Sequence, residues 1–196
     1  ATDTRAGVNE LRFAGGALDE ADVARNLNSI AAAAASGDCV VAYLHNHEWG
    51  EDMAVTKPWA RDFARRCVEA GAQVFVSHGA PLLHGIELYR GRPLLHDLGS
   101  LVFHTRTEVG YYPAEVWETV IVHCEFEDGR LAALEAVPVV LNETGDDPAR
   151  HLETRGRPRI ATGAAAERIL GRLAKMSGEL GAALRVERDR ATLTLG

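Results

Sequence analysis

The chain has 196 residues, of which 46% are hydrophobic and 25% are charged, and its formal net charge is -7. This composition is typical of a globular domain with a real core, and the acidic balance argues against a nucleic-acid partner, which would require a basic surface. No run of about eighteen apolar residues is present, so no membrane span is predicted. No signal peptide is visible, so we expect a cytoplasmic protein, with an exported protein as the alternative.

The three cysteines are predicted to be small buried hydrophobic residues. Cys39, Cys67 and Cys124 each lie in an apolar, periodic segment, and none belongs to a C-x-x-C pair. An odd number of cysteines also argues against a secreted fold that is built on disulfides.

The amino-terminal part predicts a connector followed by a helix. Residues 1–17 have weak periodicity and several glycines, which favours an extended connector with one short strand over 11–13. We expect a helix over 18–36, because its apolar residues recur at helical spacing. Asp19 can cap the first turn of this helix, and Gly37 can end it.

The next segment predicts a β-α-β unit. Residues 38–44 and 72–76 have almost no polar interruption, which is typical of strands that are covered on both faces. Between them, a helix is expected to begin at Lys57-Pro58 and to end at Gly71. Two strands joined by such a crossover should be parallel, with a right-handed connection.

From Gly85 onward the hydrophobic period changes to two, which predicts hairpins. One hairpin turns at Arg90-Gly91-Arg92, with glycine at a positive φ, and the other turns at Asp128-Gly129, a strong turn signal. The expected strands are 86–89, 93–96, 117–127 and 131–141.

The remaining segments predict one more strand, a loop, a helix and a last hairpin. We expect a short strand over 101–103 and a surface loop over 142–162, which is polar and rich in Pro, Gly and Arg. A helix over 164–180 then precedes a small hairpin that ends at Leu195.

Three histidines follow the two buried-type strands. His45 and His47 are two residues apart at a strand end, so both imidazoles can face one ion, and His78 ends the next parallel strand. Ligands of open α/β sheets bind at the carboxyl ends of strands, and neutral imidazole is a common metal ligand. The pattern therefore favours a site here, although loop histidines are often inert.

Other residues near these histidines have two interpretations each. Oxygen ligands or partners of the imidazole rings can come from Glu48, Glu51 and Asp52, although these also suit a solvated acidic loop. Trp49 and Trp59 suit either a substrate wall or the core.

The other histidines give weaker signals. His84 precedes a glycine in a turn, and His96 is better explained as a satisfied core histidine. No clustering distinguishes His104, His123 and His151. Because no Gly-x-Ser-x-Gly motif, activated cysteine or phosphate-binding glycine loop is present, metal-assisted chemistry remains.

Several ordered blocks resemble the CapA, or bacterial capsule synthesis (PGA_cap), family of the calcineurin-like metallophosphatase superfamily. The first is the strand ending in His45-x-His47-x-Trp49-Gly50. It is followed by EAGAQVFVSHG at 69–79, LHGIELYRGRPL at 83–94 and DLGSLVF at 97–103, the last resembling the family's Ser-Leu-Gly-Asn-Phe-x-Phe block. The match is strong from Val40 to Phe103 and weak over the rest of the chain.

The resemblance implies an α/β fold, a four-layer α/β/β/α sandwich whose mixed sheet includes hairpins. It also implies a metal centre, often dinuclear, at the strand ends, with Mn, Fe, Zn or Ca as the divalent ion. His45, His47 and His78 are the implied metal ligands, and His47 and His78 the implied catalytic groups.

The chain departs from the family pattern in two ways. The family's early metal-binding aspartate and its asparagine-histidine block have no counterpart, so the chain looks like the carboxyl-terminal half of the fold, with the amino-terminal half as a partner. Residues 1–141 would form this half-domain, and 142–196 would add a surface loop, a helix and a small hairpin to it. Pro81 stands where the family has another histidine, so one expected ligand is missing.

These features imply an enzyme that acts on a peptide. CapA-like proteins are linked to poly-γ-glutamate capsules, and a divergent branch resembles the epimerases of ribosomally made lasso peptides. The missing ligand favours a metal-dependent peptide epimerase that inverts a Cα by acid/base catalysis. The alternatives are a metal-dependent hydrolase or capsule biosynthesis enzyme, and a binding module without catalysis.

Overall fold

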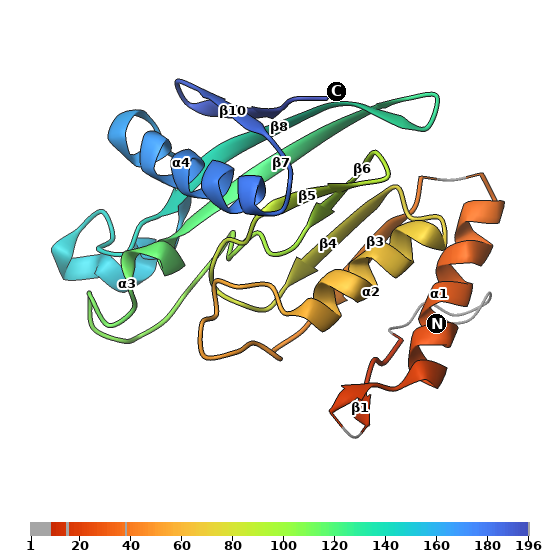
Figure 1. Cartoon of the computed structure of the whole chain (residues 1–196). Helices are drawn as coiled ribbons and strands as arrows, with labels where there is room; N and C mark the ends of the chain where they lie inside the picture. Colours follow the sequence, from red (N-terminus) through yellow and green to blue (C-terminus); the bar gives the residue numbers. More distant parts are fainter. Residues whose placement is uncertain (1–8, 15, 38, 196) are drawn as a thin grey trace.

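Two β-sheets organise the chain in the computed structural model, which describes residues 9–14, 16–37 and 39–195 (Figure 1). The four-stranded sheet has the order β3-β4-β6-β5. Strands β3, β4 and β6 are parallel, and β5 is antiparallel to β6. The bounds of these strands are Val41–His45 for β3, Val74–His78 for β4, Ile86–Tyr89 for β5 and Arg92–Leu95 for β6.

Helices α1 (Glu20–Ala35) and α2 (Pro58–Glu69) cover one face of the four-stranded sheet, beside β3 and β4 in Figure 1. The Asp19 carboxylate accepts hydrogen bonds from two amides of the first turn of α1, and Pro58 opens α2 where no amide donor is needed. The core between these helices and the sheet includes Val23, Ala42, Leu44, Phe63, Cys67, Phe75 and Leu94.

The second sheet has the order β10-β11-β8-β7, with β9 also paired to β8. Its long hairpin turns at Asp128 and Gly129, which both have the positive φ that a tight two-residue turn requires. The strands are β7 (Glu118–Glu127), β8 (Arg130–Leu141), β9 (Pro158–Ile160), β10 (Leu184–Glu187) and β11 (Arg190–Leu193).

Helix α4 (Gly163–Glu179) joins the two sheets through one shared core. Near its end, the Ser177 hydroxyl accepts a hydrogen bond of 2.9 Å from the Ile86 amide, which fixes α4 to the start of β5. Arg168 and Arg172 of the same helix pair with the buried Glu118 of β7. The core residues that α4 and the sheets share include Val74, Leu95, Val120, Leu134, Ile169, Leu170 and Leu173.

The smaller elements lie at the ends of the chain and in the connections. They are β1 (Phe13–Ala14), β2 (Ala17–Leu18), the 3-10 turns η1 (Ala114–Trp117) and η2 (Pro148–Arg150), and the short helix α3 (His151–Thr154). Among the described residues, no helix has both the length and the apolar character needed to cross a bilayer.

The α/β class expected from the sequence, with a mixed sheet and hairpins, is confirmed. The parallel pairing of β3 with β4 is also confirmed, as are both hairpin turns. The loop expected over 142–162 contains three short elements, η2, α3 and β9. Part of the connector expected over 1–17, and the expected strand start at Asp38, lie outside the described residues.

The prediction of a strand over 101–103 is wrong. Leu101 and Val102 expose their side chains in a bend, while the Phe103 ring packs edge-on against Tyr112 and Trp117. This segment is therefore held by aromatic packing instead of by strand pairing.

Two expectations about burial are also wrong. Cys39 is exposed, because it precedes β3 outside the packed part of that strand, whereas Cys67 is buried and Cys124 is half-buried. β3 is covered on one face only: Val41 and Tyr43 are 57% and 60% exposed, while Ala42 and Leu44 face α2. β3 is an edge strand in the described chain, and its uncovered face continues the one that carries Val74 and Val76.

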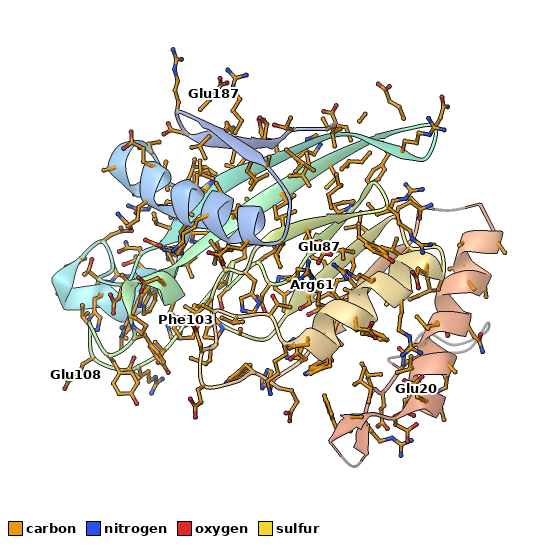
Figure 2. All side chains as sticks on the ribbon, in the orientation of Figure 1. Glu20, Arg61, Glu87, Phe103, Glu108 and Glu187 are labelled. Atoms are coloured by element: carbon orange, nitrogen blue, oxygen red, sulfur yellow. The ribbon has the colours of Figure 1, made fainter. Side chains whose placement is uncertain are left out.

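A buried carboxylate ties α2 to the four-stranded sheet. Glu87 of β5 is 2% exposed and accepts hydrogen bonds from Arg61 (2.7 Å) and Arg65 (2.8 Å) of α2 and from His96 Nε2 (3.0 Å). Figure 2 labels Glu87 and Arg61 side by side between the helix and the sheet. Burial alone would raise the pKa of Glu87, but these three donors outweigh it and lower the pKa to about 2.

We predict that Glu87→Gln lowers the free energy of unfolding by about 2–3 kcal/mol at pH 7, because two arginines lose a buried anion yet stay partly in water. Because the folded-state pKa is depressed from 4.5 to about 2, this stabilisation is present above about pH 4.5 and is lost as the pH falls towards 2. Urea unfolding at several pH values measures it.

The matched control is Glu69→Gln, which removes an exposed pair with Arg90 and should cost less than about 1 kcal/mol. Equal losses of unfolding free energy in the two variants would show that the buried Glu87 stabilises the fold no more than an exposed ion pair does.

Candidate functional site

The three predicted histidines lie at or just beyond the carboxyl ends of the neighbouring strands β3 and β4. His45 and His78 are direct partners in the parallel register. His47 returns towards His45, so that their Nε2 atoms lie 2.9 Å apart. At this distance the two rings can share a proton or bind one ion together.

Tyr43 belongs to the same cluster, although sequence reasoning placed it in the apolar run of β3. Its hydroxyl lies 3.4 Å from His45 Nδ1, and its ring centre is 5.6 Å from that of His78. The sequence could have predicted this placement of Tyr43, because residues two apart in a strand share a face and Tyr43 lies two positions before His45.

Backbone contacts join the end of β3 to the turn that follows β4. The Asn46 amide donates to the His78 carbonyl at 2.9 Å, continuing the pairing beyond the strands. Gly79 follows with a φ of 141°, and a Cβ at this position would overlap the Asn46 carbonyl. Only glycine therefore allows the turn after His78 to lie against the end of β3.

His78 is half-buried, and its electrostatic surroundings favour the neutral ring. Burial, followed by the nearby His45, lowers the pKa of His78. Its Nδ1 is buried and has no hydrogen-bond partner in the described part of the chain. A neutral ring with an uncommitted nitrogen can accept a proton or a ligand.

The acidic residues of the loop after β3 do not converge on the histidines. Glu48, Glu51 and Asp52 are exposed, and Asp52 caps a turn by accepting from the Ala54 amide. Trp49 stacks against His47, with ring centres 5.2 Å apart. Trp59 instead packs edge-on against Phe13 and belongs to the core beside α2.

Two further histidines lie beneath the site with their nitrogens engaged. His84 Nε2 donates to the Met53 carbonyl (2.7 Å), and its Nδ1 lies 2.9 Å from the Thr56 hydroxyl, so His84 fastens the loop between β3 and α2. His96 donates to Glu87, which confirms a satisfied core histidine.

The histidines at the strand ends fit a divalent metal as part of a ligand set. His45 and His47 bring two imidazole nitrogens together, and His78 lies beside His45 in the strand register. Imidazole suits Zn, Fe and Mn, whereas Ca prefers oxygen ligands. In the described ranges, no three His, Cys, Asp or Glu side chains are already grouped around one ion position. A complete centre would therefore need further ligands.

Comparisons with known proteins relate the chain to capsule synthesis proteins. The model of the family described as "Bacterial capsule synthesis protein PGA_cap" matches residues 1–105. The chain is similar to "Uncharacterized protein y4sH" and "Uncharacterized protein y4uA" of Sinorhizobium fredii (strain NBRC 101917 / NGR234), each 28% identical, over 92% of this chain and 46% of each relative. It is also similar to "Capsule biosynthesis protein CapA" of Bacillus anthracis, with 29% identity over 58% of this chain and 26% of that protein.

The coverages also show how much of each relative this chain matches. The chain spans about half the length of the two Sinorhizobium relatives. The family match covers every residue of the cluster, Tyr43, His45, His47 and His78.

We predict that Gly79→Ala destabilises the fold by more than about 2 kcal/mol, because the new methyl group must push the turn away from the Asn46 carbonyl. The same movement separates His78 from His45. Chemical denaturation and the ring resonances of the histidines measure the two effects.

Gly91→Ala is the matched control, because Gly91 also has a positive φ but no atom within 4 Å of the Cβ position. It should cost only about 1 kcal/mol and leave the histidine resonances unchanged. Similar results for both variants would mean that close approach at Gly79 does not shape the site.

Proposed function

Because the chain belongs to the bacterial capsule synthesis protein PGA_cap family, we propose that it is the carboxyl-terminal half of a metal-dependent enzyme that acts on a peptide. The observation that supports this proposal is the placement of His45, His47 and His78 at the ends of two neighbouring parallel strands, with His45 beside His78 in the register and His45 Nε2 2.9 Å from His47 Nε2. In open α/β sheets this edge is where ligands bind.

The reaction that suits the cluster best is inversion of one Cα of a ribosomally made peptide, such as a lasso peptide. The lowered pKa of His78 favours its neutral ring at neutral pH, and a neutral ring can accept the Cα proton. The electron pair of the broken C–H bond moves onto the adjacent carbonyl oxygen, and an acid on the opposite face returns a proton to Cα. Proline at position 81, where the resembling family has a histidine, leaves His78 without a neighbouring imidazole ligand in that turn.

His45 and His47 would hold the metal ion in this proposal. A bound divalent ion would polarise the peptide carbonyl beside the reacting Cα. The 2.9 Å separation of their Nε2 atoms supports this role, and the stacking of Trp49 on His47 orients one of the two rings.

Hydrolysis or capsule biosynthesis is the second candidate, favoured by the similarity to the capsule biosynthesis protein CapA. The same residues would then act on amide-linked glutamate, with water as the attacking group. The two candidates differ in product, because hydrolysis shortens the substrate and epimerisation leaves its mass unchanged in ordinary water.

The uncovered face of β3 supports a further part of the proposal, an amino-terminal half of the same protein that packs there. Val41 and Tyr43 are more than half exposed on β3, which is an edge strand among the strands that the structure describes. The relatives that match 92% of this chain are longer, because the match covers only 46% of each of them. Such a half would also supply the remaining metal ligands.

We predict that His47→Ala and His78→Ala fail in different ways. His47→Ala should lower both metal content and turnover, since a lost ligand weakens the ion itself, whereas His78→Ala should abolish turnover and keep most of the metal. The full-length protein is incubated with a candidate peptide in deuterated water, and deuterium entry at Cα is followed together with bound metal.

Each outcome of this experiment decides between the candidates. Equal metal loss in both variants, with a shortened product, would replace the epimerase with the hydrolase. Undiminished deuterium uptake in His78→Ala would exclude His78 as the base. A full-length protein with neither metal nor turnover would be a binding module.

We also predict that Val41→Lys destabilises the full-length protein by about 2 kcal/mol or more, because the amino-terminal half buries this position and a buried unpaired charge is costly. Ile121→Lys is the control, since Ile121 is a β-branched strand residue that is 45% exposed on β7, and its change should stay within about 0.5 kcal/mol. Thermal unfolding measures both, and equal small effects would mean that the face of β3 is open to solvent.

A further inference from the structure

Asp97 is a buried carboxylate that the proposed reaction does not use. It is 2% exposed and follows the end of β6, next to the turn that carries His78. Its Oδ2 accepts a hydrogen bond of 3.1 Å from the Ala80 amide, and its Oδ1 accepts one of 2.9 Å from the Gly99 amide. One carboxylate therefore joins the turn after β4 to the turn after β6.

The surrounding contacts show how this junction fixes His78. The Ser77 hydroxyl donates to the His96 carbonyl (2.6 Å), so the residues on both sides of His78 and Gly79 are bound to the end of β6. On the other side, the Asn46 amide holds the His78 carbonyl from the end of β3. The His78 backbone thus lies between two fixed strand ends, and Asp97 supplies one of the fastenings.

Asp97 differs from the other buried carboxylates of the described chain in having no cationic partner. Asp22, Glu87 and Glu118 are each buried beside two arginines, which offset the cost of burying a charge. Asp97 has only the two backbone donors, and burial raises the pKa of its carboxyl to about 7 despite them. Such a group is sensitive to pH in the neutral range.

The titratable groups that share the space around Asp97 are few. A cavity of about 20 Å³, about the size of one water molecule, lies between the strand ends and the start of α2 and is lined by Asp97. The other charged or titratable groups that line it are Glu48 and Lys57 from the loop between β3 and α2, His84 from the segment after β4, and His96 from the end of β6.

Protonation of Asp97 would disrupt one of its two contacts. Both of its partners, the Ala80 and Gly99 amides, are donors, so a proton on either carboxyl oxygen sets a donor against a donor. We propose that ionised Asp97 is a positioning residue that holds the turn Ser77–Ala80 and so orients His78, and that protonation of Asp97 releases this turn. For its effect on turnover, the proposal rests on the function proposed above.

The first test follows the turn itself and needs no reaction. The full-length protein, freed of metal by a chelator and labelled at histidine rings and backbone amides, is titrated by NMR across neutral pH. The Ala80 and Gly99 amide protons and the His78 ring should share one inflection near pH 7. Asp97→Asn should remove the inflection from all three, and Asp22→Asn, an equally buried carboxylate far along the chain, should preserve it.

Two results would overturn the proposal. An inflection that persists in Asp97→Asn would belong to another group of the cavity, such as His84 or His96. An inflection at Ala80 and Gly99 that never reaches His78 would leave Asp97 with a structural role only.

The second test measures the pH dependence of deuterium entry at Cα. In the unchanged protein the rate should fall as the pH drops through about 7, whereas Asp97→Asn should lose this limb of the pH profile. At pH 8 we expect a roughly tenfold lower rate in Asp97→Asn, because its amide can accept only one of the two bonds. No deuterium entry in any variant would refute the proposed function, while the NMR titration would still decide the role of Asp97.

Discussion

The parallel pairing of β3 with β4 is the constraint on which the rest of the site depends. In this register His45 lies directly beside His78, and the pairing continues to the Asn46 amide and the His78 carbonyl. A shift of one residue would send every side chain of β3 to the opposite face, placing Tyr43 and His45 against α2 and leaving Ala42 and Leu44 uncovered. Burial of Ala42 and Leu44 against α2 therefore determines which way the histidine points.

Buried carboxylates connect the layers that hold these strands in place. Glu87 binds two arginines of α2, and Glu118 binds two arginines of α4, so each sheet is tied to a helix by the same chemistry. A charge removed from water needs partners of opposite charge, and side chains from two elements meet that need only in one relative placement. These contacts fix how the helices sit on the sheets, while the apolar cores supply the driving force.

Features with local causes could be predicted from the sequence. Asp19 caps α1, Pro58 begins α2, and Asp128-Gly129 turns the long hairpin, because each is decided by neighbouring residues. The grouping of His45 with His78 also followed, since parallel strands end at one edge. What failed depended on distant partners. The 101–103 segment packs its phenylalanine on Tyr112 and Trp117, nine and fourteen positions away, and one face of β3 is open because β3 is an edge strand among the described strands.

The role of Asp97 also could not be predicted from the sequence, because no sequence pattern around it indicates a ligand or a helix cap. Its significance comes from two backbone amides that the fold brings to it, one of them seventeen positions earlier in the chain. Sequence analysis identifies side chains that carry chemistry, but it does not identify a carboxylate whose partners are backbone groups.

The histidines in and beneath the site fall into two groups according to their hydrogen bonds. His84 and His96 are buried, and fixed partners in the fold already bind their ring nitrogens, His84 through both nitrogens and His96 through Nε2. His45 and His47 engage mainly each other, and His78 has a nitrogen without a partner in the described chain. Histidines that gain or lose a ligand or a proton need nitrogens that the fold does not already use. By this criterion the histidines at the ends of β3 and β4 are the ones that suit the proposed chemistry, and His84 and His96 stabilise the loop and strand ends beneath them.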